Sequence, residues 1–202
     1  NHVFWDTSID TAAKTRECAA LMEMIIKHDY PVNSIITADR GYEKYNLMAC
    51  CIENNQKFLI RTKDINVYSS ILSNLNLPDE EFDLNVTKIL TRTQTNETKA
   101  NKQKYTFISN KSEFNYFGTK EFYKMNLRVV RFKITDDTYE CLVTNLTRDE
   151  FDLTELKKMY HMRWDIETAF KVLKYIIGMI SFHSKKRNFI QQEIYRPFCC
   201  TV

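Results

Sequence analysis

Apolar and polar positions alternate along the first third of the chain in a way that predicts strands and helices in turn. Residues 15–28 (TRECAALMEMIIKH) carry apolar side chains with helical spacing, and 45–55 (YNLMACCIENN) predict a second helix. Short β-prone or apolar runs flank these helices at 2–9 (HVFWDTSI), 34–38 (SIITA) and 57–61 (KFLIR). The order β-α-β-α-β is typical of an α/β sheet.

The pattern changes between residues 64 and 147, where β-rich runs follow one another. They lie at 82–93, 104–110, 126–134 and 139–146, and the last two are joined as a hairpin by TDDT. We expect a β-rich insertion in the α/β sheet. Its loop TQTNETKANKQK (93–104) is polar and carries three lysines, which fits a contact with a polyanion and equally a solvated hairpin tip.

A helical pattern returns at Asp152, which is expected to cap a helix together with Glu155 and to be followed by helix to about Gly178. At ~100° per residue, Tyr160, Arg163, Glu167 and Lys174 fall within roughly 60° of one another. The apolar residues occupy a separate arc, so this helix has a buried face and an organised polar face. A further amphipathic segment is expected from about Ile190.

Composition allows one main domain and excludes several classes of protein. The chain has 202 residues, 44% of them apolar, and a net charge of +3, which is too small to establish nucleic-acid binding by itself. Six cysteines without a C-x-x-C spacing, and four histidines away from them, disfavour structural zinc and indicate a reduced, cytoplasmic setting. No apolar run has the length of a bilayer span. The chain is expected to be a fragment, incomplete at both ends.

Asp39 is the first candidate for chemistry, because it follows the apolar run SIITA. Open α/β sheets place working groups at the carboxyl ends of their strands. Arg40 next to it can meet a phosphate, and Gly41 permits a tight turn. The alternative interpretation is an aspartate that only shapes the turn before the next helix.

Glu167 is the second candidate, as the only carboxylate in the polar face. A carboxylate oxygen is the ligand that Mg²⁺ or Mn²⁺ requires, and two metal ions held by carboxylates are a known device for phosphodiester chemistry. The spacing of Arg163, Glu167 and Lys171 also describes an ordinary ladder of solvated ion pairs. Neither interpretation is decided by this face alone.

The spacing Tyr160, Arg163, Glu167, Lys174 resembles the Y-R-E-K signature of the insertion-sequence-four type of DDE transposases. The block ITADRGYEKYNLMACCIENNQKFLIRTKD (36–64) is similar to the region around their second catalytic aspartate. The resemblance implies a ribonuclease-H-like mixed sheet with helices, interrupted by a β-rich insertion. It implies a partial core at 1–63, the insertion at 64–147 and the C-terminal helical part of the core at 148–202.

The resemblance also implies roles for individual residues. Asp39 matches the second aspartate and Glu167 the glutamate, so both are expected to be catalytic and to bind Mg²⁺ or Mn²⁺. Tyr160, Arg163 and Lys174 match positions that contact DNA phosphates near the element end, and Arg40 is given a supporting role in DNA binding. The implied partners are the terminal inverted repeats, target DNA and a second copy of the chain on paired ends. The implied location is the cytoplasm of a bacterial or archaeal cell, in association with the nucleoid.

The first catalytic aspartate of such a site is not assigned. Asp6 and Asp10 are near the start of the chain, but the segment around Asp6 resembles a later strand of the family's fold. We therefore expect a transposase core that is inactive as this fragment. The alternatives are a non-catalytic DNA-binding remnant and a metal-dependent nuclease of the same fold.

Overall fold

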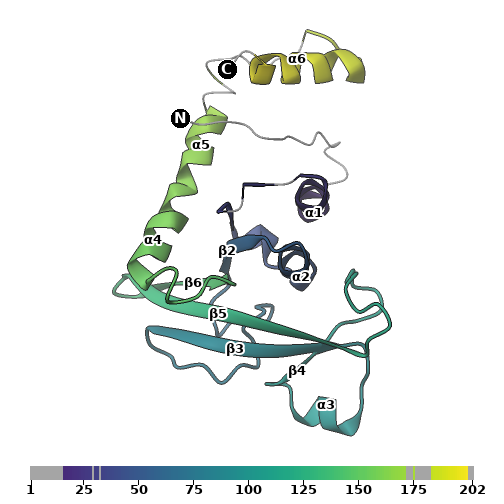
Figure 1. The fold of residues 1–202 in the computed structure, drawn as a ribbon. Coiled ribbons are helices and arrows are strands. Elements are labelled where there is room, and N and C mark those ends of the chain that lie inside the picture. Colours follow the sequence, from purple (N-terminus) through teal and green to yellow (C-terminus); the bar gives the residue numbers. More distant parts are fainter. Residues whose placement is uncertain (1–15, 29, 32, 172–174, 176–182, 200–202) are drawn as a thin grey trace. The chain divides into compact units, whose positions relative to one another are not determined.

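The computed structural model describes residues 16–28, 30–31, 33–171, 175 and 183–199, and these form a mixed α/β structure. The chain divides into two compact units: the larger is Glu17–Tyr160, and the smaller is Asn1–Arg16 with His161–Val202. The larger unit holds all the strands of the described residues (Figure 1). The expected strand at 2–9 and the expected end of the long helix near Gly178 lie outside the described residues.

Six strands make one sheet in the order β1-β2-β6-β5-β3-β4. Their bounds are β1 Ile35–Ala38, β2 Lys57–Thr62, β3 Phe82–Thr91, β4 Tyr105–Phe107, β5 Phe122–Thr135 and β6 Thr138–Thr144. β1 is parallel to β2 and β3 is parallel to β4, whereas the other neighbouring pairs are antiparallel. The mixed sheet confirms the fold class expected from the sequence.

The β-rich stretch continues the sheet of the α/β segment, because β6 pairs with β2. Leu59 faces Thr144 across this pair, and Thr62 faces Cys141. The hairpin between β5 and β6 turns at residues 136–137, as TDDT predicts. The division of the chain at residues 63 and 147 stays a prediction.

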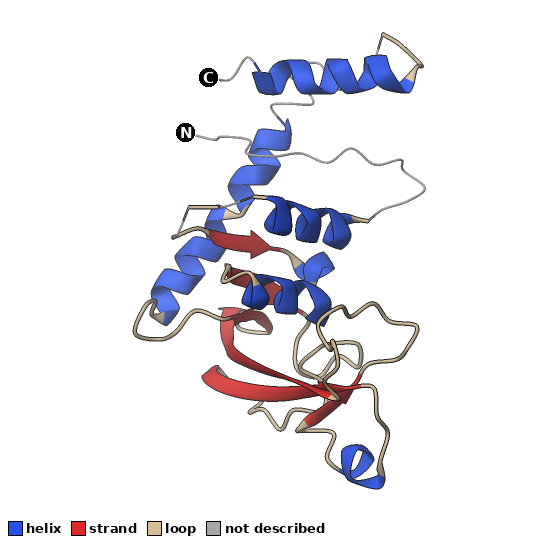
Figure 2. Ribbon diagram, turned by 45° about the vertical axis from the view of Figure 1, so that its right-hand side comes forward, coloured by secondary structure: helices blue, strands red, loops and turns tan. Residues whose placement is uncertain are grey.

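Alternate residues of the strands supply two separate cores, one on each face of the sheet. Phe58 and Ile60 of β2 pack with α1 (Glu17–Lys27) and α2 (Tyr45–Glu53), while Leu59 between them packs on the opposite face. That opposite face is covered by α4 (Leu153–Met162) through Leu156. Successive side chains of β2 point to opposite faces, and Phe58, Leu59 and Ile60 are all buried, so helices cover both sides of the sheet (Figure 2).

The loop 93–104 differs from the expected hairpin tip. It contains the short helix α3 (Asn96–Ala100), which begins at a capping box between Thr95 and Thr98. The strands on either side of the loop, β3 and β4, are parallel, so the chain has to cross over rather than turn back. α3 is part of that crossover.

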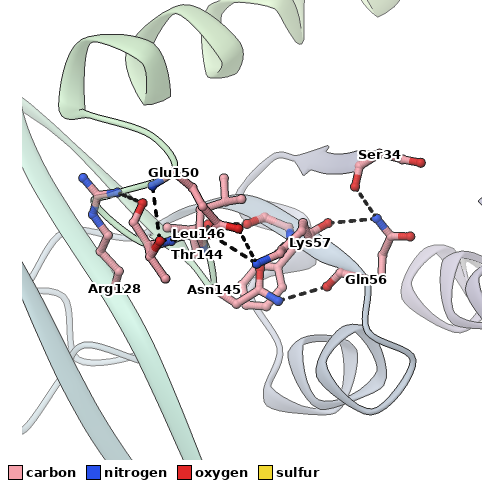
Figure 3. A network of polar contacts seen from close by, with 10 residues as sticks. Ser34, Gln56, Lys57, Arg128, Thr144, Asn145, Leu146 and Glu150 are labelled. Atoms are coloured by element: carbon pink, nitrogen blue, oxygen red, sulfur yellow. Dashed lines mark hydrogen bonds and ion pairs between the residues drawn. The ribbon is translucent and has the colours of Figure 1, made fainter. Parts of the chain in front are cut away.

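The end of β6 and the start of α4 are held by a polar network (Figure 3). Asn145 accepts from the N–H of Phe58 at 2.9 Å and donates to the carbonyl of Gln56 at 3.0 Å. Lys57 reaches Glu150 at 3.1 Å, and Glu150 accepts from the N–H of Thr147 at 3.0 Å. These contacts fix the loop before α4 to β2, close to where β1 and β2 pair.

The start of α4 confirms the expected cap. The N–H of Glu155 donates to Asp152 Oδ1 and the N–H of Asp152 donates to Glu155 Oε2, both at 2.8 Å. Two further α-helices, α5 (Trp164–Lys171) and α6 (Arg187–Cys199), belong to the smaller unit, and a 3-10 helix (Arg40–Tyr42) belongs to the larger one. The single helix expected from Asp152 onward is therefore interrupted, because Arg163 is a turn residue between α4 and α5.

Candidate active site

Asp39 follows β1 directly, at the carboxyl end of the parallel pair β1 and β2. It is exposed, and it caps the 3-10 helix Arg40–Tyr42 by accepting a hydrogen bond from the N–H of Gly41 at 2.8 Å on Oδ1. Within the described residues its other oxygen, Oδ2, takes part in no hydrogen bond or ion pair. The side chain shapes the turn and still presents one free carboxylate oxygen. A turn-shaping role and a metal-binding role of Asp39 are therefore compatible with each other.

Gly41 is the residue that allows this close approach. A Cβ at position 41 would lie 3.1 Å from Asp39 Oδ1, which is tighter than ordinary van der Waals contact. The Gly41 carbonyl accepts a weak hydrogen bond from the Cys18 thiol at 3.6 Å, so α1 also supports the turn. Burial raises the pKa of the neighbouring Tyr42, and the nearby negative charge of Glu17 raises it further, which leaves the phenol protonated beside Asp39.

Glu43 ties this turn to the rest of the larger unit. Its two carboxylate oxygens accept from the N–H of Lys63 at 2.9 Å and from the N–H of Ile71 at 2.7 Å. Glu43 thereby joins the segment after Asp39 to the end of β2 and to the turn beyond it. Sequence reasoning missed this residue, since its partners lie far along the chain and no local spacing marks them.

Glu167 lies on α5 and is partly exposed, with 45% of its side chain accessible. Its Oε1 pairs with Arg163 at 3.3 Å, one helical turn earlier, as the ion-pair interpretation predicts. Lys171 adds no ion pair to Glu167 among the residues the structure describes. Glu167 Oε2 makes no hydrogen bond there either, so this carboxylate also keeps one uncommitted oxygen.

Arg163 is more enclosed than the expected polar face would make it. Its side chain is only 12% exposed, and its guanidinium lies 5.1 Å from the ring centroid of Trp164. Trp164 itself is 51% exposed, so it does not pack in a core. The indole ring and Glu167 together hold the guanidinium.

Tyr160 does not lie on a solvent-facing surface. It is 3% exposed and belongs to the core between α4 and the sheet, with Leu59, Leu142 and Leu156. An aromatic ring with one hydroxyl suits a core and a polar face alike, so helical spacing could not separate the two. Lys174, the fourth residue of the signature, lies outside the described residues.

The structure describes the two candidate carboxylates in different units, Asp39 in the larger and Glu167 in the smaller. Among the described residues, no cluster of three or more histidine, cysteine, aspartate or glutamate side chains could hold a metal ion. Arg40 is exposed next to Asp39. No helix in the described segments combines the length and apolar content that a bilayer span requires.

A six-stranded mixed sheet with helices on both faces is consistent with a ribonuclease-H-like fold. The family model of the transposase DDE domain matches residues 7–202, and the chain belongs to that family. It is therefore a DDE transposase domain, in a family that acts on DNA and generally uses divalent metal ions. No curated protein matches the chain.

Proposed function

We propose that this chain is the catalytic core of a transposase of the insertion-sequence-four type. In this proposal a phosphodiester at the element end is hydrolysed, and the freed 3′-hydroxyl then attacks target DNA. Asp39 and Glu167 carry the chemistry as metal ligands. The observation that supports this most is that each carboxylate is fixed through one oxygen while the other oxygen has no partner among the described residues.

These carboxylates fit Mg²⁺ or Mn²⁺, both of which prefer oxygen ligands. The Gly41 N–H and the Arg163 guanidinium each orient one carboxylate without occupying both of its oxygens. When bound, a divalent ion supplies Lewis-acid stabilisation of charge on the reacting phosphate. The third carboxylate of the family's site remains unassigned.

The proposed DNA contacts have unequal support. Arg40 is exposed beside Asp39, where a guanidinium can meet a phosphate next to the reacting one. Arg163 is proposed chiefly to hold Glu167, with a phosphate contact through the same guanidinium. Tyr160 is buried in the core against the sheet, so it is given no phosphate contact, and for Lys174 the proposed contact relies on the Y-R-E-K spacing alone.

The proposed partners are the terminal inverted repeats of the element and the target DNA, with two copies of the protein assembled on paired ends. Nucleoid association in the cytoplasm of a bacterial or archaeal cell follows from that substrate. These proposals come from the family and are supported by the exposure of Asp39 and Arg40.

Strand transfer tests the proposal. The protein, expressed from its complete reading frame, is incubated with Mg²⁺, labelled DNA from the repeats that flank its own gene, and a supercoiled target plasmid. We expect joined products from the wild type, and none from Asp39→Asn or Glu167→Gln, while both variants still bind the ends. Cleavage without joining would indicate a nuclease, and end binding without any cleavage would indicate a non-catalytic remnant.

A further inference from the structure

A groove of about 560 Å³ lies in the larger unit, away from the carboxylates that the proposed chemistry uses. One wall is the turn 68–74, and the other is made by α3 and β4. Ser70 and Thr91 also line the groove and are buried. Figure 1 shows α3 and β4 at the end of the sheet opposite to β1 and β2.

The charge of the groove has one sign. Lys99 and Lys102 line it and are exposed, and no aspartate or glutamate is among the lining residues. Neither lysine forms an ion pair within the part of the chain that the structure describes. The acidic residue of α3, Glu97, does not pair with either lysine and accepts a hydrogen bond from the Tyr105 hydroxyl at 3.1 Å. Two ammonium groups are therefore available to an anion.

Apart from Ile71, the rest of the lining is made of side chains with hydroxyls, amides or aromatic rings. The hydroxyls of Ser69 and Ser73 act only as acceptors within the described residues, so both can donate to phosphate oxygens. Tyr68 is 97% exposed, and Phe107 is 47% exposed, so flat apolar surface is available for deoxyribose or a base. Cations, hydroxyl donors and exposed rings together match the chemistry of a nucleic-acid strand.

Both walls are held in place without a ligand. The Lys63 ammonium donates to Ser69 Oγ at 2.8 Å, and the Tyr45 hydroxyl donates to the Ile71 carbonyl at 3.0 Å. On the other side Thr95 caps α3 through the N–H of Thr98 at 3.2 Å. A preformed groove loses little conformational freedom when it binds.

We propose that this groove binds the phosphodiester backbone of DNA, with Lys99 and Lys102 each neutralising one phosphate. The inference rests on the proposed function, which makes DNA the substrate, and it adds a contact that is separate from Asp39 and Glu167. Because the cations face backbone groups, the contact positions the DNA and does not read its sequence.

The salt dependence of binding tests this contact. A fluorescent duplex carrying the element end is titrated with the protein from its complete reading frame, in Ca²⁺ instead of Mg²⁺ to prevent cleavage, over a range of salt concentrations. Each phosphate contact contributes ~0.9 to the slope of log K against log salt. The double variant Lys99→Gln/Lys102→Gln is expected to lower the magnitude of that slope by about 1.8.

Lys111→Gln/Lys120→Gln is the matched control, since both lysines are exposed and lie outside the groove lining. Its slope is expected to change much less, and Lys99→Arg/Lys102→Arg is expected to keep the wild-type slope. Equal slopes for the wild type and Lys99→Gln/Lys102→Gln would overturn the groove contact alone. A wild-type protein that binds no DNA would overturn the proposed function as well.

Discussion

The carboxylate of Glu43 accepts a hydrogen bond from the backbone N–H of Ile71 at 2.7 Å, although the two residues are far apart in the sequence. Glu43 lies just after the turn that holds Asp39, and Ile71 lies in the turn that forms one wall of the lysine-lined groove. One side chain therefore connects the proposed catalytic turn with the proposed DNA-binding groove. Its second bond, to the N–H of Lys63 at 2.9 Å, fixes the end of β2 between them.

Glu43→Gln should destabilise the larger unit. An amide has one acceptor oxygen, so one of the two N–H groups would face an NH₂ and lose its partner, at a cost of about 1–3 kcal/mol. Urea unfolding of the wild type and the variant measures the difference. Glu113→Gln is the control, since Glu113 is exposed, and it should leave stability within ~0.5 kcal/mol. Equal stabilities for Glu43→Gln and the wild type would contradict the bridging role.

Gly41→Ala should weaken metal binding more than it weakens the fold. The new methyl group would lie 3.1 Å from Asp39 Oδ1, so the carboxylate has to move while the rest of the turn is largely kept. We expect a several-fold loss of Mn²⁺ affinity in electron paramagnetic resonance titrations, with a cost in stability of roughly 1 kcal/mol or less.

Gly118→Ala gives the matched control for that experiment. Gly118 has a φ of +56°, and a Cβ at this position would meet no atom within 4 Å, so alanine there strains the backbone without touching Asp39. It should cost roughly 1 kcal/mol in stability and leave Mn²⁺ affinity unchanged. A loss of affinity in Gly118→Ala equal to that in Gly41→Ala would show that the effect is not local to Asp39.

Lys88 should make stability depend on pH in the alkaline range. It is 2% exposed on β3, and burial lowers the pKa of its ammonium from 10.5 to about 8. The folded-state pKa is the lower one, so the unfolded chain binds more protons between these two values and this lysine's contribution to stability rises with pH there. Below about pH 8 the full penalty of a buried charge opposes folding.

Lys88→Met removes that penalty, because methionine has a similar length and no charge. We expect an increase in the free energy of unfolding at pH 7 on the order of 3 kcal/mol, which shrinks as the pH approaches 10.5, the pKa of the lysine in the unfolded chain. Unfolding the wild type and the variant side by side isolates the effect, since the buried cysteines and tyrosines titrate in both. An increase that is the same at every pH would rule out titration of Lys88 as its cause.

The sequence predicted the elements whose signal is local. The helical spacing around Met22 and Ile25, the apolar run before Asp39 and the reciprocal cap of Asp152 and Glu155 all appear as expected. Each of these depends on residues within a few positions of one another, where side-chain period and hydrogen-bonding capacity determine the backbone. The exposed position of Asp39 after its strand follows from the same kind of signal.

Other features depended on partners distant in the chain. The pairing of β6 with β2 and the burial of Tyr160 depend on which surfaces meet in the folded unit. The spacing of apolar and polar residues along one strand or helix does not contain that information. The interruption at Arg163 has no proline or glycine to mark it. By contrast, α3 was predictable in principle, because Thr95 and Thr98 have the spacing of a capping box.

Calorimetric titration with Mn²⁺ tests the central claim, that Asp39 and Glu167 are metal ligands of a transposase active site. The wild type is compared with Asp39→Asn, Glu167→Gln and Asp165→Asn, the last being a control because Asp165 is an exposed acid on the same helix as Glu167. We predict a binding signal in the wild type and in Asp165→Asn that is lost in both other variants. A signal of equal size in all four proteins would contradict the assignment of both carboxylates.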